Sequence, residues 1–410
     1  MTMKRLVLTL IALFTVLGAS AQLQDRTLRV DYIFSGTDKE ASISVASLNS
    51  FNTWAGRRVN MDKVPLRGNG QISMADAVTG QVLYRMSFST LFQEWQATEE
   101  ATRVTKAFEN VFLLPMPESP VNITVELYDF HGKAVASLTH PVDPSDILIR
   151  PVGDNPPPTI DIHHSGPSSR CIDIVFVPEG YTRQEMGIFL QDCRAAWASF
   201  MNHEPFASMR DRFNVIAALI PSEESGVSVP RNGDWKSTAL ESHFDTFYSD
   251  RYLTTLQLTR LHNQVAGLPY EHIIILANST TYGGGGIYNS YELTAAHHSA
   301  YAPVVVHEFG HSFAGLADEY HYDDQFVEYY YPDVEPWEQN ITTRFDFASK
   351  WEDMMGQPGV GLFEGGGYQS KGVWRSAQDC RMNTNSCPAF CPVCQRAIAR
   401  MIDFYTVENE

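Results

Sequence analysis

The sequence predicts a protein of the α+β class, with an N-terminal β-sandwich-like domain over residues 22–150 and an α/β domain over residues 161–410. Three observations predict this division. Short runs of alternating apolar and polar residues fill the first region, a proline-rich segment occupies residues 151–160, and buried-strand patterns then alternate with helical patterns. The chain has 410 residues, of which 44% are hydrophobic and 19% charged, so it is long enough and apolar enough to form two cores.

The first 21 residues have the pattern of a secretory signal peptide. A short positive region precedes an apolar run over residues 6–17, and residues 19–21 fit a small-x-small cleavage site. An uncleaved membrane anchor is the alternative, but the apolar run is shorter than the roughly 20 residues that a helical span needs. We therefore expect removal of residues 1–21, no membrane span in the mature chain, and a secreted location: periplasm, cell surface or extracellular medium.

The region that follows predicts β-strands. Apolar and polar residues alternate over residues 28–34 and 123–127, and Gly132 marks a turn. Several such short strands are typical of a β-sandwich. No residue pattern in this region suggests catalysis, so we expect a packing or binding module. The prolines of residues 151–160 favour a stiff, extended linker.

The second domain shows strand and helix patterns in alternation. Apolar runs of strand length are followed by segments whose apolar residues recur with helical spacing. We expect strands over residues 172–177, 213–220 and 273–276, and helices over residues 184–200, 253–265 and 302–314. Four glycines stand directly before Ile287, and they allow the backbone to approach another element closely; a flexible loop is the alternative.

The last of these helices contains the sequence His307-Glu308-Phe309-Gly310-His311. Because four residues span about one helical turn, both imidazoles lie on one face and can bind a single ion, for which tetrahedral Zn²⁺ is the expected choice. Glu308 stands beside the first ligand and can accept a proton from a zinc-activated water as general base. Chance produces this pattern in about one chain of this size in forty, so the pentapeptide needs support from its surroundings.

A catalytic zinc needs a third protein ligand and an open fourth position. Gly315 can take the left-handed conformation that ends a helix, after which the chain can turn back toward the metal. Asp318 is the first candidate for the third ligand, and Glu319 is the second. Glu328 and Glu335 are further candidates from a separate element.

The block over residues 307–320, HEFGHSFAGLADEY, resembles peptidase family M64, the IgA-peptidase family. The block is also similar to the metzincin pattern H-E-x-x-H-x-x-G-x-x-H. It departs from that pattern in two ways, because the glycine stands one residue later and an aspartate replaces the third histidine. The resemblance to M64 accommodates both departures and leaves the third ligand open.

The resemblance implies a fold and a site. It implies an N-terminal β domain followed by a metzincin-like α/β zinc-peptidase domain. It also implies that residues 283–287 form an edge strand above the cleft, to which an extended peptide can add. Met382 would then be the Met-turn residue, a soft apolar floor beneath the zinc.

All six cysteines lie beyond residue 170. An even number of cysteines in an exported protein favours disulfides, and the pairing stays open. A structural zinc held by the C-terminal cluster is the alternative. Two cysteines stand early in the second domain and four form the C-terminal cluster: Cys171 and Cys193, then Cys380, Cys387, Cys391 and Cys394.

The sequence thus predicts a secreted zinc-dependent endopeptidase that binds one catalytic Zn²⁺ through His307, His311 and Asp318, with Glu308 as general base. The formal net charge of −18 argues against nucleic acid as a partner, so the expected partner is a protein or peptide substrate. Two alternatives stay open: a zinc amidase acting on cell-wall or glycan-linked peptides, and a non-catalytic surface binding protein. The intact Glu308 argues against the latter. The substrate, the role of the N-terminal domain and the oligomeric state are not predicted.

Overall fold

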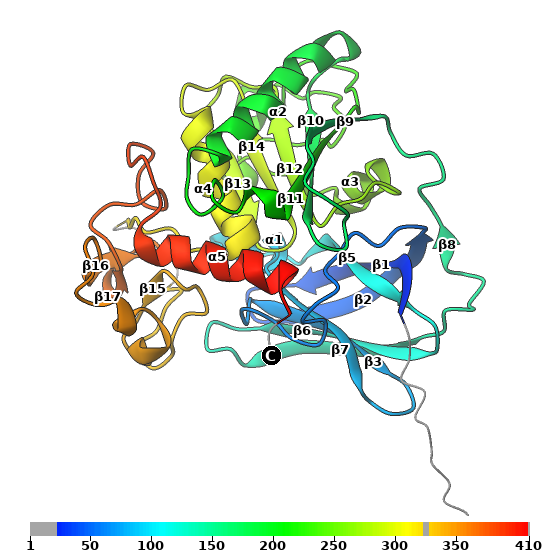
Figure 1. Cartoon of the computed structure of the whole chain (residues 1–410), viewed down its shortest axis with the longest axis horizontal. Helices are drawn as coiled ribbons and strands as arrows, with labels where there is room; N and C mark the ends of the chain where they lie inside the picture. The colour runs from blue at the N-terminus through cyan, green and yellow to red at the C-terminus, as the bar shows by residue number, and fades with distance from the viewer. Residues whose placement is uncertain (1–22, 323–327, 409–410) are drawn as a thin grey trace, which may run out of the picture.

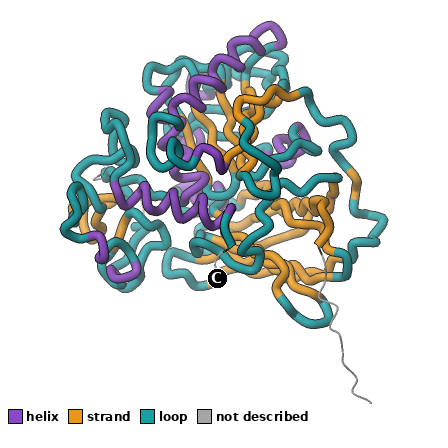
Figure 2. Tube along the Cα trace, viewed as in Figure 1, coloured by secondary structure: helices purple, strands orange, loops and turns teal. Residues whose placement is uncertain are grey.

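The computed structural model describes residues 23–322 and 328–408 of the chain. The signal peptide predicted over residues 1–21 lies outside the described residues. Two sheets of the N-terminal half lie below a larger sheet and its helices in the view of Figure 1, and Figure 2 shows the strands of each half gathered together. The coarse prediction of the α+β class is therefore confirmed.

Two four-stranded sheets form the N-terminal half, with the orders β5-β1-β2-β8 and β4-β3-β6-β7. Their strands pair antiparallel, except for the short parallel pair β2–β8. Every second residue of β6 is buried, as the alternating sequence predicts. Helix α1 spans Leu91–Gln96, and the strands are β1 (Leu23–Gly36), β2 (Ala41–Phe51), β3 (Gly70–Asp76), β4 (Val82–Phe88), β5 (Lys106–Pro117), β6 (Val121–Tyr128), β7 (Ala134–Val142) and β8 (Arg150–Pro151).

Aromatic side chains fill the space between these two sheets. Phe88 of β4 packs against Phe34 of β1 and Phe112 of β5, and the rings of Phe88 and Phe112 have centroids 4.5 Å apart. The two sheets therefore pack face to face around one core, as in a sandwich. Beyond β8 the proline-rich segment leads to β9 (Thr159–His163), which already belongs to the next sheet. The predicted domain boundaries at residues 150 and 160 stay predictions.

A six-stranded sheet with the order β13-β14-β12-β10-β11-β9 forms the centre of the second half. The neighbours within β14-β12-β10-β11 are parallel, and the two outer strands, β13 and β9, are antiparallel to theirs. Strands β10 and β12 are buried along their whole length, as expected for parallel strands covered on both faces. The remaining strands are β10 (Ile172–Glu179), β11 (Phe213–Ala218), β12 (His272–Ala277), β13 (Gly284–Ile287) and β14 (Tyr291–Ala295).

The two faces of this sheet are covered differently. Ile174 and Phe176 of β10 share a core with α2 (Met186–Phe200), α4 (Tyr301–Ala314) and α5 (Pro392–Thr406). Val175 and Val177 point to the opposite face, where α3 (Leu258–Gln264) and the sandwich residues share one continuous core. Figure 1 shows α2 and α4 on one side of the sheet and α3 on the other. The sandwich is therefore part of the packing of the second sheet.

A small sheet with the order β15-β17-β16 precedes α5. It lies beside α5 at one edge of the molecule (Figure 1). Its strands are β15 (Ile341–Thr342), β16 (Phe363–Gly366) and β17 (Gln369–Arg375). Among residues 23–322 and 328–408, no helix has both the length and the apolar character that a membrane crossing requires.

Two sequence predictions need correction. The helix predicted over residues 253–265 begins only at Leu258, because Thr254 instead forms a bridge with His243. The predicted disulfides are not formed, and all six cysteines are free thiols. The sulfur atoms of Cys380 and Cys394, for example, are 3.8 Å apart, whereas a disulfide requires about 2.05 Å.

Candidate metal centre and active-site cleft

Helix α4 places both histidines of the HExxH sequence on one face. The Nε2 atoms of His307 and His311 are 3.0 Å apart, one helical turn from each other along α4. Two imidazole ligands of a tetrahedral zinc ion, each about 2.05 Å from the metal, would be about 3.3 Å apart. The spacing predicted from the sequence is thus present in the structure and agrees with that separation to within about 0.3 Å.

Backbone carbonyls orient both rings. His307 Nδ1 lies 2.9 Å from the carbonyl oxygen of Arg381, and His311 Nδ1 lies 2.6 Å from that of Leu316. Since a carbonyl oxygen only accepts, each Nδ1 donates the hydrogen bond, and in the neutral imidazole Nε2 then carries the lone pair. Outer hydrogen bonds of this kind are the usual partners of metal-binding histidines. The Nε2 lone pairs of His307 and His311 are consequently both available to one ion bound between the two rings.

Asp318 completes the group. Gly315 ends α4 with φ 58° and ψ 35°, the left-handed conformation predicted for it. The chain then returns, and Asp318 Oδ1 lies 3.0 Å from His307 Nε2 and 3.3 Å from His311 Nε2. The three ligand atoms lie within 4.8 Å of one another. Two imidazole nitrogens and one carboxylate oxygen are a donor set that suits Zn²⁺ and leaves a fourth position open.

The charges of these groups are strongly coupled. Burial acts to raise the pKa of Asp318, but His311 and His307 outweigh it and hold that pKa well below its usual range. Burial acts to lower the pKa of His311, yet Asp318 and Glu308 raise it to about 9. Asp318 is therefore ionised at neutral pH, and a metal ion at this position would displace the proton that Asp318 stabilises on His311.

The other acidic candidates lie elsewhere. Glu319 is fully buried and belongs to a second group, with Cys380, Cys391 and Cys394, so it is not part of the histidine group. Glu335 accepts a hydrogen bond from the backbone of Asp346 and lies 3.9 Å from Lys350 Nζ. Glu328 is exposed at the rim of the cleft. Of the acidic candidates, only Asp318 meets the histidines.

Tyr368 is a contact that the sequence does not reveal. Its hydroxyl donates a hydrogen bond to Asp318 Oδ2, while Asp318 Oδ1 faces the histidines. The backbone of the same segment is also held in place, because Gly367 N donates to the carbonyl of Asp318 at 2.8 Å. Fifty residues separate Tyr368 from Asp318, and no spacing rule connects them.

Glu308 lies on the cleft side of α4, against the glycine strand. Strand β13 is an edge of the sheet, as the resemblance implies. A Cβ atom on Gly286 would lie 2.2 Å from the Glu308 carbonyl oxygen, and one on Gly284 would lie 2.9 Å from Glu308 Oε1. The glycines therefore allow the strand to approach the helix, as their sequence predicts. Burial raises the pKa of Glu308, although His307 and His311 act in the opposite direction.

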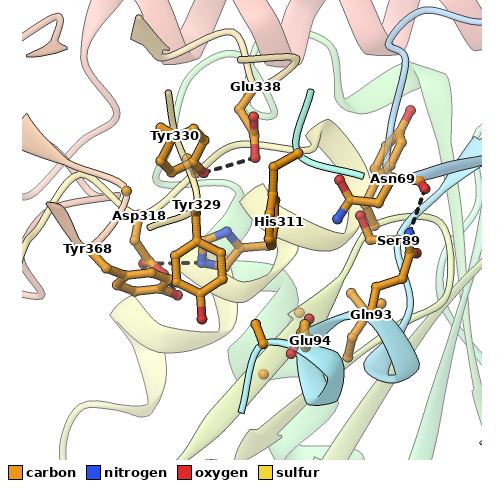
Figure 3. A pocket seen from close by; sticks show the side chains of 18 of the residues that line it. Asn69, Ser89, Gln93, Glu94, His311, Asp318, Tyr329, Tyr330, Glu338 and Tyr368 are labelled. Carbon is orange, nitrogen blue, oxygen red and sulfur yellow. Dashed lines mark hydrogen bonds and ion pairs between the residues drawn. The ribbon is translucent and has the colours of Figure 1, made fainter. Parts of the chain in front are cut away.

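The histidine group opens into a cleft of about 1290 Å³ between the two halves of the molecule. Gln93 and Glu94 of α1 line one side, and His311, Asp318 and Tyr368 line the other (Figure 3). Burial raises the pKa of Glu94 to about 7. The N-terminal half thus forms one wall of the cleft, a role that its sequence pattern does not indicate.

Met382 lies in a turn beneath α4. It is fully buried, and a Cβ atom on Gly310 would lie 2.8 Å from its sulfur. Its carbonyl accepts a hydrogen bond from Glu319 N at 2.8 Å. This turn therefore supports both α4 and the segment that carries Asp318.

Comparison with known proteins agrees with this architecture. The profile described as IgA Peptidase M64 matches residues 160–359 and 356–402, and the profile described as Peptidase M64 N-terminus matches residues 20–139. The chain belongs to peptidase family M64. Members of M64 are peptidases and generally metallopeptidases, so the enzyme class predicted from the sequence is confirmed at this level. No curated protein matches the chain.

Proposed function

We propose that this M64 peptidase is a secreted, zinc-dependent endopeptidase with a metzincin-like catalytic domain. One observation carries the proposal: His307 Nε2, His311 Nε2 and Asp318 Oδ1 converge on the wall of a large cleft, directly beside Glu308. His307, His311 and Asp318 would hold one Zn²⁺. When bound there, zinc supplies Lewis acidity toward a peptide carbonyl and toward water.

Glu308 is suited to move the proton. Its carboxylate lines the cleft next to the histidines but is not part of the group that can hold the ion. Because burial raises its pKa, Glu308 is a better base than an exposed carboxylate. Glu308 accepts a proton from the attacking water and then donates it to the leaving amine, so the peptide bond breaks with the water added across it.

Strand β13 supports an extended peptide as substrate. It is an edge strand that lines the same cleft as the histidines. An edge strand can pair with an extended peptide through main-chain hydrogen bonds, which do not require a particular side chain. The carbonyl of the bound peptide would then lie beside α4. This arrangement fits cleavage within a chain better than removal of single terminal residues.

Two further observations support the finer parts of the proposal. The buried Met382 turn beneath α4 is the position in which a Met-turn is expected. The signal-peptide pattern of residues 1–21 supports secretion.

The test is cleavage of a proteome-derived peptide library, with the cleavage sites mapped by mass spectrometry. We expect internal cleavages that a chelator abolishes and that added Zn²⁺ restores. A parallel panel of cell-wall and glycan-linked peptides addresses the amidase alternative. Cleavage of that panel alone would replace the endopeptidase proposal, and absence of any chelator-sensitive cleavage would overturn it.

A further inference from the structure

A second group of metal-binding side chains lies in the core behind the cleft. It contains Glu319, Cys380, Cys391 and Cys394, whose ligand atoms all lie within 4.8 Å of one another. Three of the four side chains are fully buried, and Cys391 is 6% exposed. Cys387, the remaining cysteine of the C-terminal cluster, is half-buried, and its sulfur lies 3.4 Å from the carbonyl of Ala389 instead. The group thus comprises three thiols and one carboxylate.

The distances within this group suit one tetrahedral ion. Two thiolates, each about 2.3 Å from a tetrahedral zinc, are about 3.8 Å apart. The sulfur atoms of Cys380 and Cys394 are 3.8 Å apart, and Cys394 Sγ lies 3.1 Å from Glu319 Oε1. Three sulfur ligands favour Zn²⁺ over Ca²⁺ or Mg²⁺, which prefer oxygen.

The local backbone is arranged around the sulfur atoms. Cys391 caps the N-terminus of α5, and its sulfur accepts a hydrogen bond from Cys394 N at 3.4 Å. The sulfur of Cys380 accepts one from Cys391 N at 3.1 Å. The spacing C-x-x-C at a helix start is common in structural zinc sites. Amide donors and the positive end of α5 both favour thiolates, the form that binds metal.

Glu319 supplies an independent observation. Its side chain is fully buried, and its Oε1 atom accepts a hydrogen bond from Asn340 Nδ2 at 3.0 Å. Its Oε2 atom is also buried and has no hydrogen-bond partner among the described residues. A buried carboxylate with an unpartnered oxygen is costly unless a cation compensates it.

We propose that Glu319, Cys380, Cys391 and Cys394 bind a structural Zn²⁺ ion, distinct from the ion of the cleft. All four ligands come from the protein and all are buried, so the site has no position open to substrate. The function of the ion is to connect the loop after α4, the turn at Cys380 and the start of α5.

This connection reaches the cleft through neighbouring residues. Glu319 directly follows Asp318, and Cys380 precedes Arg381, whose carbonyl orients His307. The carbonyl oxygen of Met382 accepts a hydrogen bond from Glu319 N, which connects the segment after α4 to the turn at Met382. The structural ion would therefore hold in place the segments that position Asp318 and His307.

The first test counts zinc by plasma mass spectrometry in protein purified by gel filtration. Its central variant, His307→Ala with His311→Ala, removes the cleft ligands and leaves the thiol site intact. We expect one zinc per chain in this variant. A folded variant that contains no zinc would overturn the proposal, whereas loss of peptidase activity alone bears only on the cleft.

The second test uses the unmodified protein, so it does not depend on a variant that folds. Alkylation is followed at each cysteine in the native state. We expect a chelator to accelerate alkylation of Cys380, Cys391 and Cys394 about tenfold or more, with no change at Cys193, which is fully buried in α2. Chelator-independent alkylation, or a disulfide among the three cysteines, would overturn the proposal.

Matched serine variants locate the ion. Cobalt-loaded protein with thiolate ligands absorbs through sulfur-to-metal charge transfer. In the background without the cleft histidines, Cys387→Ser should retain the full absorption, and Cys391→Ser should lose about a third of it or more, because it removes one of three thiolates. Full retention in the Cys391→Ser variant would exclude this site.

Discussion

Asp318 and Glu319 are adjacent in the chain but belong to two different sites. Asp318 faces the histidines on the wall of the cleft, where His307 and His311 retain 11% and 14% side-chain exposure. Glu319 faces three cysteines in the core and has no exposure at all. The first group has nitrogen and oxygen ligands, and the second has mainly sulfur.

This difference indicates a separate role for each of the two groups. A catalytic zinc keeps an open position for substrate, whereas a structural zinc is closed by protein ligands. The exposure of the histidine group and the burial of the cysteine group match these two classes. One loop, directly after α4, contributes a carboxylate to each.

The largest expected effect is a loss of kcat without a loss of bound zinc. Glu308→Gln should lower kcat about 10²- to 10⁴-fold, because it removes the general base, and should leave the zinc content of both sites unchanged. Glu352→Gln, an exposed carboxylate on a short helical turn, is the control. Peptide-cleavage kinetics and metal analysis check this. A Glu308→Gln enzyme within tenfold of the parent would rule out Glu308 as the base.

The next effect tests the division between the two adjacent acids. Asp318→Asn should weaken zinc binding at the cleft about 100-fold or more and spare the thiol site, since it removes a charged ligand. Glu319→Gln should have the reverse selectivity. Competition with a fluorescent zinc chelator measures both. If either substitution released zinc from both sites equally, the two groups would be one coupled site.

A smaller loss of zinc affinity is expected from Tyr368, which contacts a metal ligand but is not one itself. Tyr368→Phe removes the hydrogen bond to Asp318 Oδ2 while keeping the ring. Partners that orient a metal ligand are worth about 10- to 100-fold in metal affinity or activity. Tyr322→Phe provides a matched control, because the ring of Tyr322 stacks on that of Tyr368 with centroids 6.1 Å apart. Zinc titrations of both variants check this, and equal affinities would show that Tyr368 does not position Asp318.

The smallest effect concerns a buried histidine that has no carboxylate partner within residues 23–322 and 328–408. His272 packs against Phe309 and Phe313 of α4, and burial lowers its pKa from 6.5 to about 3. Above pH 6.5 it is neutral in both the folded and unfolded states and contributes nothing. Below pH 6.5 the unfolded chain takes up a proton that the folded chain refuses until about pH 3, so stability falls as the pH falls.

His272→Phe removes this titration. Relative to that variant, the parent protein should lose about 1.4 kcal/mol of unfolding free energy for each pH unit below 6.5. Urea denaturation between pH 7 and pH 5 measures the difference. Parallel pH profiles for the two proteins would show that the His272 ring reaches water and that burial does not lower its pKa.

Much of the fold is predictable because its signals are local. The strand patterns at residues 172–177 and 273–276 became β10 and β12, and the pattern at residues 302–314 became α4. The helix predicted from residue 253 failed in its first turn, where a tertiary bridge between His243 and Thr254 replaces helical hydrogen bonds. The disulfide prediction failed because cysteine number and compartment do not specify which sulfur atoms meet.

Two features of the site are encoded locally: His307 and His311 share one helix face, and Gly315 ends that helix, because both follow from backbone geometry within a few residues. Long-range packing, in contrast, directs Asp318 toward the histidines and Glu319 toward the cysteines. From Leu316 to Tyr320 the chain is neither helix nor strand, so no period assigns a side to each residue. Those directions are set by docking against Tyr368 and Met382, contacts that span 50 residues of sequence or more.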